Sequence, residues 1–212
     1  MSNPKSKMNG GMSMSLIAER PCVTPQEYLE RERRAETKSE YSDGVITPMS
    51  GATKEHIKIT VDMQGHLWTQ LRGNVCEVYN NDTRTRVLRG DKYYYPDIVI
   101  VCGEARFEDN VFDTLMNPTL IVEILSESTE HKDRNEKRDA YETLDSLTNY
   151  VLISQTEPRI EHYSRLPDGA WHYFAARGRD AILPLPNIGC ELRLAEVYLR
   201  VSFETQDTGK TI

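Results

Sequence analysis

The sequence predicts an α+β protein in which a mixed β-sheet is flanked by helices, and three observations favour it. The elements run helix, hairpin, helix, several strands, helix and strands, without a strict strand–helix alternation. The segments 98–101 and 120–122 are continuously apolar, as in central strands buried on both faces. A length of 212 residues, 38% of them hydrophobic and 28% charged, suits one domain with a core.

The domain is expected to span residues 16–203. Residues 1–15 contain Ser, Asn, Gly, Lys and four methionines, which predicts a disordered N-terminal lead-in. Residues 204–212 are expected to form a flexible C-terminal tail.

The first two elements have local signals. Thr24 can cap a helix, Pro25 suits its first position, and Glu27 completes a capping box, so a helix is predicted to about residue 35. Asp43-Gly44 lies between two short strand-like runs and predicts a hairpin.

A second helix is predicted from about residue 55 to residue 72, and Gly73-Asn74 ends it. Its expected apolar face consists of Ile57, Val61, Leu67 and Leu71.

The remaining elements are mostly strands. Strands are predicted at 75–79, 83–88, 95–102, 119–125, 149–154 and 159–163. A third helix is predicted at 133–144, a hairpin turn at 167–169 and a last helical turn at 195–198.

Composition excludes some classes of function. The net charge of −7 argues against a protein that coats nucleic acid by bulk charge, but it leaves room for a nuclease with a local basic patch. The apolar runs are too short to cross a bilayer and no signal peptide is evident, so a cytoplasmic protein without a membrane partner is expected. The cysteines Cys22, Cys76, Cys102 and Cys190 lack a CxxC pair and are expected to be reduced thiols, not a disulfide framework or zinc site.

Asp97 and Glu123 are the strongest candidates for chemistry, because each belongs to a predicted buried strand. If the two strands are neighbours, the carboxylates meet at one point and offer hard oxygen ligands to Mg²⁺ or Mn²⁺. The alternative is a buried carboxylate paired with Arg or Lys for packing reasons.

Three other positions leave alternatives open. Asp133, Lys137 and Tyr141 are spaced by four and share a helix face, so Lys137 is either catalytic or part of an exposed ion pair with Asp133. Glu40 is either a site acid or a solvent-facing carboxylate on a hairpin strand. His56 opens the second helix, where a cap or surface role is commoner than catalysis, and the sequence names no partner for it.

The densest basic stretch consists of Arg84, Arg86, Arg89 and Lys92, with a local balance of about +3 against Asp91. Three tyrosines, 93–95, follow it. Basic residues beside aromatic ones can hold phosphates and stack on bases, and strand alternation places Arg84 and Arg86 on one face. The alternative is a solvated strand face.

Several of these segments together resemble the Uma2 family of endonucleases, formerly a domain of unknown function, within the PD-(D/E)xK superfamily. The likeness extends over residues 24–199. It is carried by Tyr95-Pro96-Asp97 with strand 98–101, Pro118-Thr119 with strand 120–125, Glu40-Tyr41, Asp43-Gly44, His56, Ser126, Ser128-Thr129, Asp133-Arg134, Lys137 and Tyr141.

The resemblance implies a restriction-endonuclease-like fold and a metal-dependent endonuclease that hydrolyses phosphodiester bonds, with DNA as the expected substrate and a homodimer as the expected assembly. Asp97 and Glu123 would bind Mg²⁺ or Mn²⁺ with the backbone carbonyl of Ile124, and Glu40 would complete the shell or hold a second ion. Because Leu125 occupies the superfamily's lysine position, Lys137 would be the catalytic lysine, and Arg134 would join the nucleic-acid contacts. The alternatives are a degenerate nuclease fold kept as a binding or assembly module, which the acidic charge and the missing strand lysine favour, and hydrolysis of another phosphoester.

Overall fold

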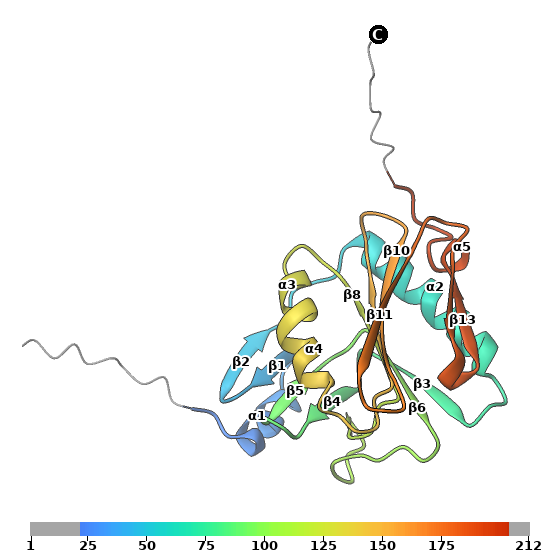
Figure 1. Ribbon diagram of the computed structural model, residues 1–212. Helices are drawn as coiled ribbons and strands as arrows, with labels where there is room; N and C mark the ends of the chain where they lie inside the picture. Colours follow the sequence, from blue (N-terminus) through green and yellow to red (C-terminus); the bar gives the residue numbers. More distant parts are fainter. Residues whose placement is uncertain (1–21, 204–212) are drawn as a thin grey trace, which may run out of the picture.

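The larger of two main sheets has six strands in the order β11-β10-β9-β8-β6-β3 (Figure 1). Its strands are β3 (Cys76–Asn80), β6 (Ile98–Cys102), β8 (Leu120–Ile124), β9 (Asn149–Ile153), β10 (Arg159–Arg165) and β11 (Trp171–Arg177). Only the β8–β9 pair is parallel, so the sheet is mixed. This computed structural model describes residues 22–203, and the lead-in expected at 1–15 and the tail expected at 204–212 lie outside the described residues.

A second, five-stranded sheet has the order β2-β1-β5-β4-β7. Its strands are β1 (Ser39–Ser42), β2 (Val45–Pro48), β4 (Arg84–Val87), β5 (Lys92–Tyr94) and β7 (Thr114–Leu115). A separate hairpin pairs β12 (Ile182–Leu185) with β13 (Cys190–Arg193). The α+β class is therefore confirmed, with more than the one expected sheet.

Helices cover both faces of the larger sheet. α2 (Lys54–Leu71) and α5 (Leu194–Val197) lie on one face, and α4 (Arg138–Tyr141), with the preceding α3 (Glu130–Lys132) and π-helical turn (Asp133–Lys137), lies on the other. α1 (Pro25–Glu32) packs on the smaller sheet, and a 3₁₀ turn (Pro186–Ile188) precedes β13. One core joins α2, α5 and β13 to Ile98, Ile100 and Val122, and the other joins α4 to Val99 and Ile121. Alternate residues of β6 and β8 enter opposite cores, so both strands are apolar except for Glu123 in β8.

The signals at the first two elements are confirmed. Thr24 Oγ1 accepts from the Glu27 amide at 3.2 Å, and the Glu27 carboxylate accepts from the Thr24 amide at 2.9 Å, although α1 ends at Glu32 and not near residue 35. Asp43 and Gly44 turn β1 into β2 with φ of 48° and 88°, the left-handed conformation that a two-residue hairpin requires.

The predicted apolar face of α2 is wrong in its first half. Ile57 and Val61 are about half exposed, and the buried face consists of Ile59, Met63, Leu67 and Leu71. Apolar residues occur on both sides of this helix, so contact with the sheet, and not periodicity alone, selects the buried side.

The expectation of four reduced cysteines is also wrong. Antiparallel pairing of β3 with β6 places Cys76 opposite Cys102, and the two form a disulfide. Cys22 and Cys190 are free. Within residues 22–203 no helix is both long and apolar enough to cross a membrane.

Candidate active site

Asp97 and Glu123 meet because β6 and β8 are antiparallel neighbours, with Ile98 opposite Val122. Asp97 lies just before β6, and its Oδ2 accepts a hydrogen bond from the Ile124 amide at 2.7 Å. Both carboxylates are buried, with 8% and 4% exposure. The expected adjacency of the two acidic strands is therefore present.

His56 holds the other oxygen of Asp97. Its Nε2 lies 2.8 Å from Asp97 Oδ1, while its amide donates to the capping hydroxyl of Thr53 at 3.1 Å. The first turn of α2 thus places the imidazole against the start of β6. This partnership joins residues 41 positions apart and has no local sequence signal.

Lys137 is buried among three carboxylates and is only 5% exposed. Its Nζ lies 2.8 Å from Glu40 Oε1, 3.1 Å from Glu123 Oε1 and 3.2 Å from Asp133 Oδ1. The pair with Asp133 exists, but the alternative of an exposed ion pair is wrong. Lys137 instead links the hairpin strand β1 to the central strand β8.

Glu40 is buried as well, with 7% exposure, so the solvent-facing alternative does not hold. Its Oε2 lies 2.8 Å from Lys132 Nζ, and its Oε1 is shared by Lys137 and the Tyr95 amide, the latter at 3.4 Å. Burial raises the pKa of Glu40, but Lys137 and Lys132 outweigh burial and lower it below its usual value. Glu40 is therefore ionised at neutral pH.

Sequence reasoning missed Lys132. It lies in α3 with its side chain 26% exposed, and its ammonium is 5.2 Å from the centre of the Tyr94 ring. Its separation from Glu40 is 92 residues, and no spacing rule connects the two.

The site carries an excess of negative charge. Four buried carboxylates, from Glu40, Asp97, Glu123 and Asp133, face the ammonium groups of Lys132 and Lys137, which leaves two negative charges when all are ionised. Burial raises the pKa of Glu123 well above its usual value, and the lowering by Lys137 does not compensate. Burial lowers the pKa of Lys137, but Glu123, Glu40 and Asp133 raise it well above normal, so Lys137 stays charged. A divalent cation would balance this excess.

The donor chemistry fits Mg²⁺ or Mn²⁺. No three His, Cys, Asp or Glu side chains within residues 22–203 are gathered as a metal-binding group. Mg²⁺ needs only one or two protein carboxylates, because it keeps several waters and accepts substrate phosphate oxygens. Asp97 and Glu123 supply two such carboxylates side by side.

The predicted basic contact surface is mostly absent. Arg84 is 2% exposed and pairs with Asp113, while Arg86 pairs with Glu108. The two arginines lie on one face of β4, as predicted, but both pair with acidic residues of the segment 106–113. A phosphate contact by Arg84 is therefore wrong, because its guanidinium is buried. The tyrosines at 93–95 are buried too and are not free to stack on bases.

The other predicted contact residues differ from one another. Lys92 pairs with Asp43, and Arg134 lies 2.7 Å from Glu130 and 2.5 Å from Glu161. Arg89 is exposed, and within residues 22–203 it forms no ion pair. The local positive balance is thus largely cancelled by acidic partners.

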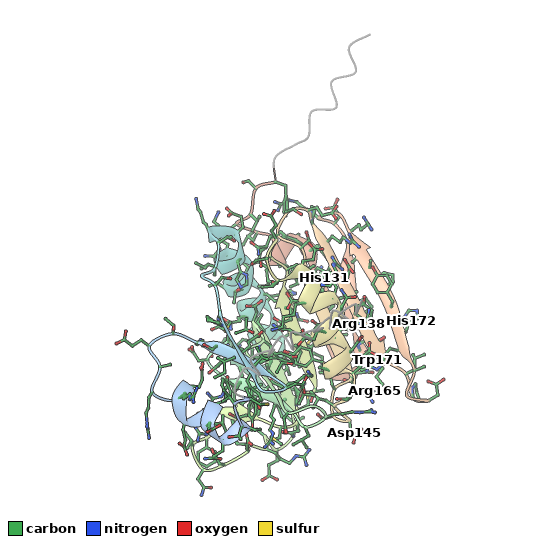
Figure 2. All side chains as sticks on the ribbon, turned by 90° about the vertical axis from the view of Figure 1, so that its left-hand side faces the viewer. His131, Arg138, Asp145, Arg165, Trp171 and His172 are labelled. Atoms are coloured by element: carbon green, nitrogen blue, oxygen red, sulfur yellow. A yellow bond between two sulfur atoms is a disulfide. The ribbon has the colours of Figure 1, made fainter. Side chains whose placement is uncertain are left out.

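A second set of cations consists of Arg138 in α4 and Arg165 in β10 (Figure 2). Arg138 lies 5.6 Å from the Tyr163 ring and Arg165 lies 4.7 Å from the Trp171 ring. Arg138 also pairs with Asp139, and Arg165 donates to the Glu142 and Leu144 carbonyls. Arg138 and Arg165 thus link α4 and the residues that follow it to β10.

Two acidic residues at adjacent interior strands, with a buried lysine on the helical segment that follows, thus lie together on a mixed sheet, as expected for a restriction-endonuclease-like fold. The resemblance seen in the sequence is confirmed, because the family model described as "Putative restriction endonuclease" matches residues 25–195. The chain belongs to the Uma2 family.

Similar proteins agree with this assignment. Two uncharacterized proteins from Synechocystis sp. are 34% and 33% identical over 79% and 86% of this chain and 95% of their own lengths. A crystal structure of a "putative nuclease" of DUF820 from Anabaena variabilis superimposes with a TM-score of 0.68 at 18% identity, covering 84% of this chain and 98% of that one. This last match confirms the fold.

Proposed function

We propose that this protein is a metal-dependent endonuclease that hydrolyses phosphodiester bonds in nucleic acid, with DNA as its substrate. The observation that carries the proposal is the pairing of Asp97 and Glu123 at adjacent strands, beside Lys137, in a buried cluster where carboxylates outnumber ammonium groups. Buried carboxylates without sufficient countercharge are costly, so such a cluster suits a cation. Family membership supports the same activity.

Asp97, Glu123 and the Ile124 carbonyl would hold Mg²⁺ or Mn²⁺, which when bound lowers the pKa of a water and polarises a phosphoryl oxygen. His56 and the Ile124 amide hold the Asp97 carboxylate from its two oxygens. The Tyr141 hydroxyl and Lys137 both donate to Glu123 Oε1 at 3.1 Å, which fixes the orientation of Glu123. Such hydrogen bonds to metal-binding carboxylates tune both geometry and affinity.

Isothermal titration with Mn²⁺ tests the metal assignment. We expect Asp97→Ala to bind Mn²⁺ at least about 10-fold more weakly than wild type, because it loses a charged ligand. Asp145→Ala is the matched control, since Asp145 is an exposed acid in the turn between α4 and β9 (Figure 2). Equal binding by wild type and Asp97→Ala would exclude Asp97 as a ligand.

A degenerate nuclease that serves as a binding module is the second candidate. Two observations support it. The ammonium of Lys137 is engaged by three buried carboxylates, and Leu125 occupies the strand position where the superfamily has a lysine. A plasmid-nicking assay with Mg²⁺ or Mn²⁺ separates the two candidates. Nicking by wild type that is lost in Glu123→Ala and Lys137→Ala supports the enzyme, whereas nucleic-acid binding without nicking supports the module.

A further inference from the structure

Lys137 has little capacity to reach a substrate. A lysine ammonium has three N–H donors, and three carboxylate oxygens surround this one within 3.2 Å. Its side chain is 6% exposed. A hydrogen bond from Lys137 to a phosphate would therefore require the loss of a buried ion pair.

Lys132 differs in both respects. Within residues 22–203 its ammonium has one carboxylate partner, Glu40 Oε2 at 2.8 Å, and its side chain is 26% exposed. Two N–H donors therefore remain for an oxygen that approaches from solvent. The Tyr94 ring at 5.2 Å further restrains the ammonium by a cation–π contact.

Glu40 links the two lysines, because each of its oxygens accepts from one of them at 2.8 Å. The Glu40 carboxylate therefore bridges the partly exposed ammonium of Lys132 and the buried ammonium of Lys137. Lys137 in turn contacts Glu123. With both oxygens engaged in this way, Glu40 is arranged to position lysines and not to bind a metal.

We propose that Lys132 contacts a phosphate oxygen of the substrate, and that Glu40 and the Tyr94 ring position it for this contact. This inference rests on the proposed nuclease function. A partly exposed ammonium beside an acidic site offers a phosphodiester a point of attachment that the carboxylates of the site do not.

Binding of a short fluorescent DNA duplex to the full chain, with Ca²⁺ in place of Mg²⁺ and at several salt concentrations, tests the inference. We expect Lys132→Met to weaken binding about 10-fold and to reduce the slope of log K against log salt by about one, as the loss of one phosphate contact does. Lys132→Arg keeps the charge and is expected to recover most of the affinity.

Arg193→Met is the matched control. Arg193 is an exposed cation with one carboxylate partner, Glu191 at 2.5 Å, on β13, which packs with the core opposite to that of α4. Its removal changes the net charge equally, and we expect its salt slope to equal that of wild type.

Lysine labelling gives a second reading. We expect Lys132 to react with an amine reagent and to be protected by the duplex, while Lys137 stays unreactive in the folded protein. If wild type neither binds nor nicks DNA or RNA, the proposed function fails. If wild type binds while Lys132→Met shows the same affinity and salt slope, or Lys132 reacts equally with duplex present, the assignment of Lys132 is wrong.

Discussion

Individual lysines at this site have different roles although they share a carboxylate. Lys137 is a buried countercharge for Glu40, Glu123 and Asp133. Removing one partner of such a buried pair lowers the free energy of unfolding by about 4 kcal/mol. The side chain of Lys132 is 26% exposed and has one carboxylate partner among the described residues, so loss of that pair is expected to cost less. Burial, and not residue type, therefore separates the stabilising lysine from the one available to substrate.

His162 introduces a pH dependence into stability. It is 5% exposed on β10, its Nε2 lies 2.9 Å from Asn149 Oδ1, and burial, with a smaller effect of His172, lowers its pKa to about 4 from the usual 6.5. Between these values the unfolded chain binds more protons than the folded one, so the free energy of unfolding falls as pH drops from about 6.5 to 4. The expected loss is up to ~3 kcal/mol, measured by urea unfolding across this range.

The comparison variant for this prediction is His162→Gln, which does not titrate and keeps an amide near Asn149. We expect the difference in stability between wild type and His162→Gln to change with pH over this window. His172→Gln, at an exposed neighbouring position, is expected to follow wild type. A constant difference between wild type and His162→Gln would contradict the assignment.

At the scale of elements, the helical segment after β8 is the one that sequence patterns describe least well. A regular helix is predicted at 133–144, but α3 begins at Glu130, α4 ends at Tyr141, and a π-helical turn over Asp133–Lys137 lies between them. A π turn widens the helix by one residue and is frequent at functional sites. Here it keeps Asp133 and Lys137 in contact while both point into the protein.

The β1–β2 hairpin depends on Gly44, which has φ of 88° and would place an added Cβ against the Cys22 side chain. We expect Gly44→Ala to lower the free energy of unfolding by about 2 kcal/mol, because alanine is strained at this φ and the new methyl clashes. Gly169→Ala is the control in the β10–β11 turn, with φ of 86° and no atom near the added Cβ. Urea unfolding should show the smaller loss for Gly169→Ala, and equal losses would exclude the clash.

The molecule as a whole places its candidate site where the two sheets approach each other. Glu40 comes from the smaller sheet, Asp97 and Glu123 from the larger one, and Lys132 and Lys137 from the helical segment that covers it (Figure 1). The net charge of −7 is not offset by a basic stretch at 84–92, because Asp113, Glu108 and Asp43 pair with its cations. For the proposed nuclease, attraction of nucleic acid would therefore depend on few local cations, which increases the importance of Lys132.

The Cys76–Cys102 disulfide closes a loop between two strands of the larger sheet. In denaturant without reductant we expect a thiol titration to find two reactive cysteines, Cys22 and Cys190, and four after reduction. Replacing both Cys76 and Cys102 by serine is expected to lower the free energy of unfolding by about 3 kcal/mol, because the open chain has more unfolded conformations. Four reactive thiols before reduction would show that the bond is absent.

Four features follow from the amino-acid sequence alone: the α+β class, the capping box of α1, the β1–β2 hairpin and the interior position of β6 and β8. Each depends on neighbouring residues or on a continuously apolar run. The sequence also singles out Asp97 and Glu123, because a buried carboxylate in an apolar strand is costly unless it is paired or binds a metal. The residues that contact these two carboxylates become evident only in the folded protein. Contacts of this kind join segments that are far apart in the chain, so they arise only when sheets and helices pack, and they leave no periodic pattern in the sequence. They include His56 with Asp97, Lys132 with Glu40, Arg84 with Asp113, Cys76 with Cys102 and the buried side of α2.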